Sequence, residues 1–203
     1  MFNLFVSYFQ SSNPERQKEL DRCLEKNLGN PFIKKIYLLI EEPILIKGAI
    51  KITPILIKSR PSYNNMFEII KQNSGPDDWN IISNSDIFFD ESIIFVNKYK
   101  SVKPICFALC RWEVTGNNVT FLNRKDSQDC WIFKGHPRAI SGDFNLGVAG
   151  CDNAIADRFF KAGYDVINPS RTVKTYHVHE TQLRTYNPDI KVAQPYKLLT
   201  PTV

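Results

Sequence analysis

Polar, oxygen-bearing side chains interrupt an apolar run at residues 81–92, "IISNSDIFFDES". Asn84, Ser85 and Asp86 offer a carbonyl, a hydroxyl and a carboxylate within one turn of chain. Hard divalent cations such as Mg²⁺ and Mn²⁺ take oxygen ligands of this kind and share them with phosphates. Both Asn and Asp also favour ordinary turns, so a purely structural role is the alternative interpretation of these residues.

The elements that must position this segment alternate between strands and helices up to about residue 90. Apolar runs at 2–9, 33–42, 52–60 and 78–83 are typical of buried strands, whereas residues 12–29 and 62–73 have the spacing of amphipathic helices. Ser12, with Glu15 three residues later, marks the start of the first helix, and Asp90 is a predicted N-cap for residues 91–97. Strand–helix–strand order favours parallel crossovers and an α/β class. Ligands of open α/β sheets lie beyond the carboxyl ends of the strands, which is where residues 84–86 fall.

The second half of the chain has a different pattern. Residues 104–114 and 118–123 are expected to form an antiparallel pair joined by "TGNN", and 128–135 to form another strand. A helix is predicted over 153–162, and the last strand within 171–180. We therefore expect one domain over 1–203, with a nucleotide-binding half at 1–90, an acceptor half at 91–185 and a C-terminal tail at 186–203.

Composition narrows the class of protein. The net charge of +5 and the isoelectric point near 8.9 are too mildly basic for a dedicated nucleic-acid binder, although they favour an anionic ligand such as a nucleotide. The five cysteines include no CxxC pair, which argues against structural zinc and favours buried, reduced thiols in a cytoplasmic location. Neither a signal peptide nor a transmembrane segment is predicted.

Three blocks in the sequence, taken in order, resemble the GT-A glycosyltransferases. "SNSDIFFDES" resembles their DXD segment with asparagine in place of the first acid, "LGVAGCDNAIADRFFKAGYDVINPS" resembles their glycine, acid-pair and helix block, and "TYHVHET" resembles their C-terminal histidine segment. The resemblance spans residues ~1–182. It implies a single GT-A-like α/β domain, with a mixed central sheet flanked by helices.

The same resemblance implies an activity. The expected reaction is metal-dependent transfer of a sugar from a nucleoside diphosphate sugar to an acceptor hydroxyl, and a UDP-sugar donor and inversion at the anomeric carbon are favoured. The acceptor would be a glycan, glycoprotein or glycolipid, and nucleic acid is not an expected partner. A retaining outcome stays open.

The resemblance also assigns a metal site. Asp86 would bind Mn²⁺ or Mg²⁺ bridging the donor diphosphate, with Asn84 and Ser85 beside the cation or the donor. His177 would be a further ligand, and His179 competes for that role because residues two apart on a strand face the same side. Two histidines on a solvated strand face are the alternative.

Asp152 is implied as the catalytic base of an inverting enzyme. Its place at the start of a predicted helix would stabilise the ionised carboxylate, although an ordinary N-cap has the same sequence signature. The family usually has two acids here, whereas this chain has Cys151-Asp152-Asn153. Asp129 is the rival base, and its position close to Trp131 favours binding to sugar hydroxyls.

The remaining candidates would hold the donor nucleotide. Ser7, Tyr8 and Gln10 lie at the end of the first predicted strand, where the family places the base. Arg60 closes the third predicted strand and Tyr63 lies just after it, and the guanidinium would suit a phosphate or a uracil edge. Ser7 as part of the strand and Arg60 as an exposed loop residue are the alternatives.

Two other functions are alternatives to glycosyl transfer. A nucleotidyltransferase shares a similar α/β half but usually carries a glycine-rich loop after the first strand, and "SYFQSSNPERQ" contains no glycine. A non-catalytic module that binds carbohydrate or nucleic acid through basic and aromatic residues is the third hypothesis.

Overall fold

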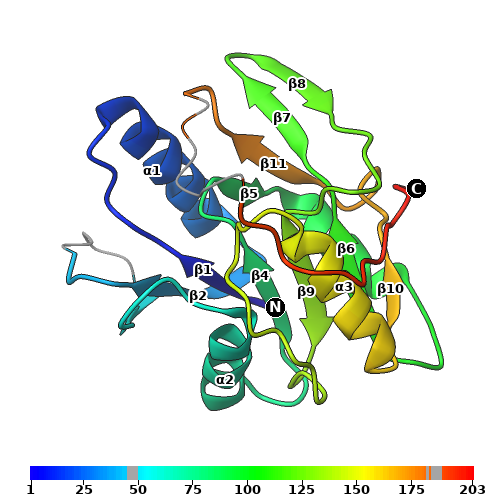
Figure 1. Cartoon of the computed structure of the whole chain (residues 1–203). Coiled ribbons are helices and arrows are strands. Elements are labelled where there is room, and N and C mark those ends of the chain that lie inside the picture. The colour runs from blue at the N-terminus through cyan, green and yellow to red at the C-terminus, as the bar shows by residue number, and fades with distance from the viewer. Residues whose placement is uncertain (45–49, 182, 184–188) are drawn as a thin grey trace.

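The computed structural model describes residues 1–44, 50–181, 183 and 189–203. Seven described strands form the main sheet in the order β10-β6-β9-β4-β1-β2-β3 (Figure 1). They are β1 (Phe2–Ser7), β2 (Ile33–Ile40), β3 (Ile52–Leu56), β4 (Trp79–Ser83), β6 (Ile105–Leu109), β9 (Cys130–Lys134) and β10 (Asp165–Ile167). Only β9 among them runs antiparallel to its neighbours. The carboxyl ends of β1 and β4 therefore lie together at one edge of a mixed sheet.

A second sheet in the order β5-β11-β7-β8 lies at that edge. Its strands are β5 (Ile87–Phe89), β7 (Trp112–Thr115), β8 (Asn118–Phe121) and β11 (Thr175–Val178). The register pairs His177 of β11 with Ile87 on one side and with Glu113 on the other. This register brings the turn at 84–86, the histidine segment and β7 to one place.

The single strand predicted over 104–114 is wrong in one respect. The chain leaves the main sheet after Leu109 and enters the second sheet at Trp112, so only β7 forms the expected hairpin with β8. The backbone N–H of Cys110 is satisfied by the side chains of Asn168 and Ser170 instead of by a strand. Because these side-chain acceptors replace a strand partner, the chain passes between the two sheets without leaving this buried N–H unpaired.

Helices cover both faces of the main sheet. The core that contains α2 (Tyr63–Asn73) and α3 (Cys151–Lys161) lies on one face, and the core that contains α1 (Pro14–Gly29) and the 3-10 helix η1 (Glu91–Lys98) lies on the other. The N-cap of α1 is Asn13, which accepts a hydrogen bond from the N–H of Arg16 at 3.0 Å, and not the predicted Ser12.

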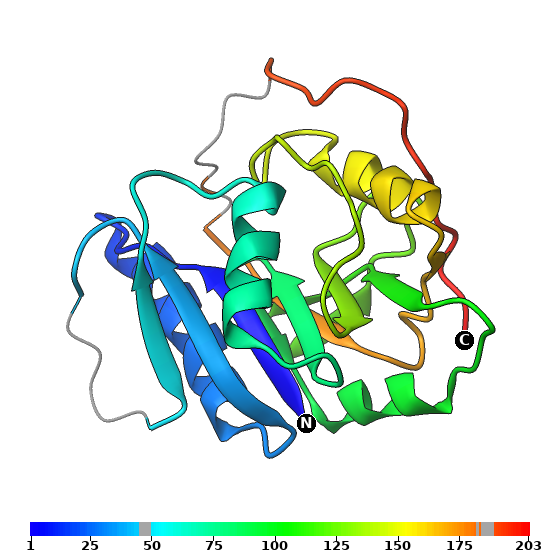
Figure 2. The same ribbon diagram turned by 90° about the horizontal axis from the view of Figure 1, so that it is seen from below.

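The C-terminal segment 189–203 runs alongside α3 (Figure 2). The N–H of Val192 donates to the carbonyl of Ala149 at 2.9 Å, and the N–H of Lys197 donates to the carbonyl of Asn153 at 3.0 Å. Gly150, and not Asp152, is the N-cap of α3, with a φ of 78° and with the Tyr196 hydroxyl where a Cβ would lie. The predicted boundary of the tail at 185/186 lies outside the described residues.

The structure bears on the predictions for the cysteines, for the two halves of the chain and for membrane spans. All five cysteines are free and buried, as predicted. Strands from both predicted halves share the main sheet, since β9 pairs with β4. No helix in the described parts of the chain is long and apolar enough to cross a membrane.

Candidate active site

A pocket of about 800 Å³ lies at the carboxyl ends of β1 and β4. Turns after parallel strands form one wall, the second sheet forms another, and the start of α3 with the C-terminal segment forms the rest. It is lined by nine of the residues predicted from the sequence: Ser7, Arg60, Asn84, Ser85, Asp86, Asp129, Asp152, His177 and His179. The fold thus brings together residues from six separate segments.

Asp86, His177 and His179 form a group with the geometry of a metal site. One ligand atom from each lies within 4.8 Å of the others, and no other such group occurs among the described residues. Nε2 of His177 lies 3.4 Å from Oδ2 of Asp86, and Nδ1 of His179 lies 3.8 Å from it. The other oxygen, Oδ1, is buried and finds no hydrogen-bond partner in the described parts of the chain. A buried carboxylate beside two imidazoles, with one of its oxygens left without a partner, fits a cation.

Arg16 is a residue of this site that the sequence did not reveal. Its Nη2 lies 2.6 Å from Oδ2 of Asp86, and its Nη1 lies 2.7 Å from Glu19. Burial alone would raise the pKa of Asp86, but His177 and Arg16 together hold it well below its usual range. Asp86 is therefore a carboxylate over the ordinary pH range.

Glu113 contacts His177 at the ring nitrogen that does not face Asp86. Its Oε2 lies 2.7 Å from Nδ1 of His177, which leaves Nε2 facing Asp86. Burial alone would lower the pKa of His177, but the two carboxylates raise it to about 9. Burial would raise the pKa of Glu113, but hydrogen bonds from His177 and Arg111 lower it to about 2.

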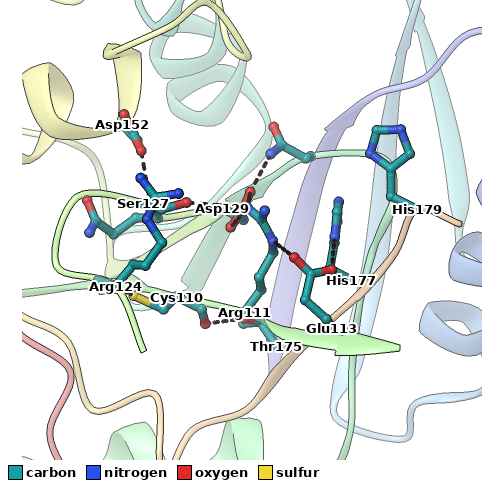
Figure 3. Close-up of polar contacts among 12 residues, drawn as sticks. Cys110, Arg111, Glu113, Arg124, Ser127, Asp129, Asp152, Thr175, His177 and His179 are labelled. Atoms are coloured by element: carbon teal, nitrogen blue, oxygen red, sulfur yellow. Dashed lines mark hydrogen bonds and ion pairs between the residues drawn. The ribbon is translucent and has the colours of Figure 1, made fainter. Parts of the chain in front are cut away.

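Arg111 joins Glu113 to the sugar-binding candidate Asp129 (Figure 3). Its Nε lies 2.6 Å from Glu113, and its Nη1 lies 2.8 and 3.0 Å from the two oxygens of Asp129. The amide of Asn84 donates to Asp129 at 3.1 Å. Both oxygens of the Asp129 carboxylate therefore already accept hydrogen bonds from Arg111.

The charges of this connected group do not balance. Ion pairs link seven residues of this group. They are the four carboxylates of Glu19, Asp86, Glu113 and Asp129, the guanidinium groups of Arg16 and Arg111, and the imidazole of His177. With neutral imidazoles the group carries two negative charges, and protonated His177 offsets one of them. A divalent cation would neutralise both, so the charge of the group as well as its geometry fits a metal.

Asp152 lies apart from these ion pairs, in the first turn of α3. Its carboxylate accepts hydrogen bonds from the N–H of Gln128 at 3.2 Å and of Asn153 at 2.9 Å. Burial raises the pKa of Asp152 to about 6, despite these hydrogen bonds to the charged form. A carboxylate with a pKa near neutrality suits a general base.

Three predicted donor contacts lie outside the pocket lining. The hydroxyl of Tyr8 donates to Asp21 at 2.6 Å, and Gln10 is exposed. Tyr63 is completely buried, packs edge-on against Trp131 with ring centroids 5.2 Å apart, and points its hydroxyl at Sγ of Cys151. The assignment of Tyr63 to the donor is therefore corrected, because its side chain belongs to the core beneath the pocket.

The site residues that were not predicted, Arg16, Glu19, Arg111 and Glu113, have spacings that indicate local pairing. Arg111 and Glu113 are two apart on a predicted strand, so alternation places them on one face. Arg16 and Glu19 have the i, i+3 spacing of a helical ion pair. Neither pattern identifies the partner, because Asp86 is 70 residues from Arg16 in the sequence.

No protein-family model and no curated protein sequence matches this chain. Its fold, however, resembles solved structures. S. aureus TarS 1-349 in complex with UDP-GlcNAc aligns with a TM-score of 0.58 at 10% identity, over 88% of this chain and 58% of that one. The mannosyltransferase PcManGT from Pyrobaculum calidifontis, in complex with GDP-Man and Mn²⁺, aligns with a TM-score of 0.57 at 10% identity, over 91% and 58%.

These identities are too low to carry more than the architecture. The chain also spans only about 58% of the length of either protein. A 2-C-methyl-D-erythritol 4-phosphate cytidylyltransferase from Francisella tularensis aligns over 93% of this chain with a TM-score of 0.45, too low to indicate a shared fold. The mixed sheet, the flanking helices and the structural neighbours agree: this chain has the GT-A fold of nucleotide-sugar glycosyltransferases.

Proposed function

We propose that this protein is a metal-dependent glycosyltransferase that uses a nucleoside diphosphate sugar. The observation that carries the proposal is the convergence of Asp86, His177 and His179 at the carboxyl end of β4, inside the pocket of a GT-A fold. A bound divalent cation would there neutralise charge on the departing diphosphate. Mn²⁺ and Mg²⁺ are both consistent with the carboxylate and imidazole ligands.

The donor is proposed to be a UDP-sugar. Arg60 supports an anionic ligand, because it lines the pocket beside Gly147 and makes no hydrogen bond or ion pair with the described residues. The TarS structure is a complex with UDP-GlcNAc and the PcManGT structure a complex with GDP-Man and Mn²⁺, so the fold accommodates both uridine and guanosine diphosphate sugars. Ser7 and Asn84, at the ends of β1 and β4, are proposed to contact the donor.

Asp152 is proposed as the base that takes the proton of the acceptor hydroxyl. Its raised pKa and its position in the same pocket as the metal ligands support this role. Asp129 is proposed to bind a sugar hydroxyl, since Arg111 and Asn84 already hold its carboxylate. Direct attack by the activated hydroxyl would invert the anomeric carbon. The acceptor is proposed to be a hydroxyl of a glycan, glycoprotein or glycolipid.

The test is thermal unfolding with UDP-sugars, GDP-sugars and CTP, each with and without Mn²⁺. A true ligand at 100 times its Kd stabilises the fold by about 2.7 kcal/mol, which is about 5–10 °C for a domain of this size. We expect the largest shift with a UDP-sugar plus Mn²⁺, and none with Asp86→Asn. Stabilisation by CTP alone, or by oligonucleotides alone, would replace this proposal with a nucleotidyltransferase or a nucleic-acid binder.

A further inference from the structure

Glu113 occupies a place that neither the metal ligands nor the donor contacts explain. It lies on β7, and the sheet register sets it directly beside His177. Its two oxygens are divided between two partners: Oε2 contacts Nδ1 of His177 at 2.7 Å, and Oε1 accepts from Nε of Arg111 at 2.6 Å. The carboxylate is thus fixed by one residue while it contacts another.

The contact decides which ring nitrogen of His177 carries a proton. A carboxylate accepts but does not donate, so Nδ1 must be the protonated nitrogen whenever the imidazole is neutral. The lone pair then lies on Nε2, the atom that faces Asp86 at 3.4 Å. His177 is only 7% exposed, so water offers little competition for Nδ1.

We propose that Glu113 is a positioning residue for His177, which fixes the tautomer and the ring orientation that metal binding requires. Outer-shell carboxylates of this kind typically contribute 10–100-fold in metal affinity. Arg111 extends the arrangement, because the same guanidinium that holds Glu113 also holds Asp129. The proposal rests on the metal site of the proposed function.

The test compares Glu113→Ala with the wild type in two measurements. Mn²⁺ affinity is measured by electron paramagnetic resonance, and the protonated ring nitrogen of His177 is identified by ¹⁵N imidazole spectra of the Zn²⁺-bound protein. We expect Mn²⁺ to bind about 10–100-fold more weakly to Glu113→Ala. We also expect the wild type to carry the proton on Nδ1 only, and the variant to have lost that single assignment.

Two further variants separate the causes. Glu41→Gln removes a charge from the same pocket without touching His177, and we expect its Mn²⁺ affinity to stay within about 3-fold of the wild type because an exposed charge is screened.

Asp86→Ala tests the metal site itself. If Asp86→Ala binds Mn²⁺ as the wild type does, the proposed function has failed. If Asp86→Ala loses Mn²⁺ but Glu113→Ala keeps both its affinity and the Nδ1 proton, only the positioning role is overturned. Weaker binding with an unchanged Nδ1 assignment also overturns it.

Discussion

Nη2 of Arg16 lies 2.6 Å from Oδ2 of Asp86, and both side chains are buried. A guanidinium in this position supplies positive charge at the carboxylate that we propose as a metal ligand. A divalent ion bound to the same carboxylate would lie close to this guanidinium and be repelled by it, so Arg16 and the ion compete for Asp86. The pair therefore couples metal binding to the N-terminal turn of α1.

Arg16→Gln should strengthen metal binding while it weakens the metal-free fold. Removing the guanidinium removes the competing cation, so Mn²⁺ affinity measured by calorimetry should rise at least about tenfold. Breaking a buried ion pair costs about 3 kcal/mol, so unfolding of the metal-free variant should begin at lower temperature. Mn²⁺ should restore more stability to the variant than to the wild type. Arg22→Gln, on the exposed side of the same helix, is the control, and weaker Mn²⁺ binding by Arg16→Gln would count against competition.

The base assignment predicts a pH dependence. Asp152 must be ionised to accept a proton, so kcat/KM should rise with pH and level off above its pKa of about 6. Asp152→Asn should lower kcat by about 10²–10⁴ while donor affinity is kept. Asp157→Asn, on the same helix but paired with Arg158 and Lys161, should keep the wild-type profile. A normal rate in Asp152→Asn would move the base to Asp129 or elsewhere.

Asp152 should make the free energy of unfolding fall as the pH rises, whereas kcat/KM rises with pH. Its pKa in the folded protein is above the ordinary value of 3.8, so the folded state holds the proton more tightly than the unfolded one. The stability that this proton contributes is fully present below about pH 4 and is lost as the pH rises through about 6. At pH 7, Asp152→Asn should therefore unfold at a temperature no lower than that of the wild type, as measured by calorimetry.

The sequence was informative where local chemistry determines local structure. Residues 84–86 were expected at the carboxyl end of a strand, and the structure places them in the pocket, because apolar strand residues followed by Asn, Ser and Asp leave few alternatives. The cap of η1 by Asp90 also followed from local pattern. Helix α1 shows the precision of such patterns, since its N-cap is one residue later than the capping-box pattern indicates.

What the sequence could not supply are relationships between distant segments. The break at Cys110–Arg111 depends on Asn168 and Ser170, which satisfy a backbone N–H from nearly 60 residues away. Arg16 became a site residue only because α1 packs against β5 and β11. Tyr63 was misassigned for the same reason: a polar aromatic after a strand does not reveal whether it points to the pocket or to the core.

The corrected position of Tyr63 gives a prediction about donor binding. Its side chain is completely buried, and its hydroxyl has only the weak acceptor Sγ of Cys151, at 3.9 Å, among the described residues. Tyr63→Phe should therefore leave both UDP affinity and stability within about 1 kcal/mol of the wild type. Tyr63→Ala should cost about 3–5 kcal/mol of folding free energy, measured by urea denaturation, because it leaves a cavity beneath Trp131. A loss of UDP affinity in Tyr63→Phe would return this residue to the donor site.

The three histidines of the chain allow an internally controlled test of the metal site. His177 and His179 lie beside Asp86, whereas His136 contacts the carbonyl of Ser74 at 2.7 Å and does not line the pocket. His177→Ala and His179→Ala should each weaken Mn²⁺ binding at least about tenfold, since each removes one protein ligand from a small set. His136→Ala should bind Mn²⁺ as the wild type does. Electron paramagnetic resonance of the bound Mn²⁺ measures all three variants under one condition. If only His177→Ala loses affinity, His179 is a pocket residue and not a ligand; if neither loses it, the cation is held without the histidines.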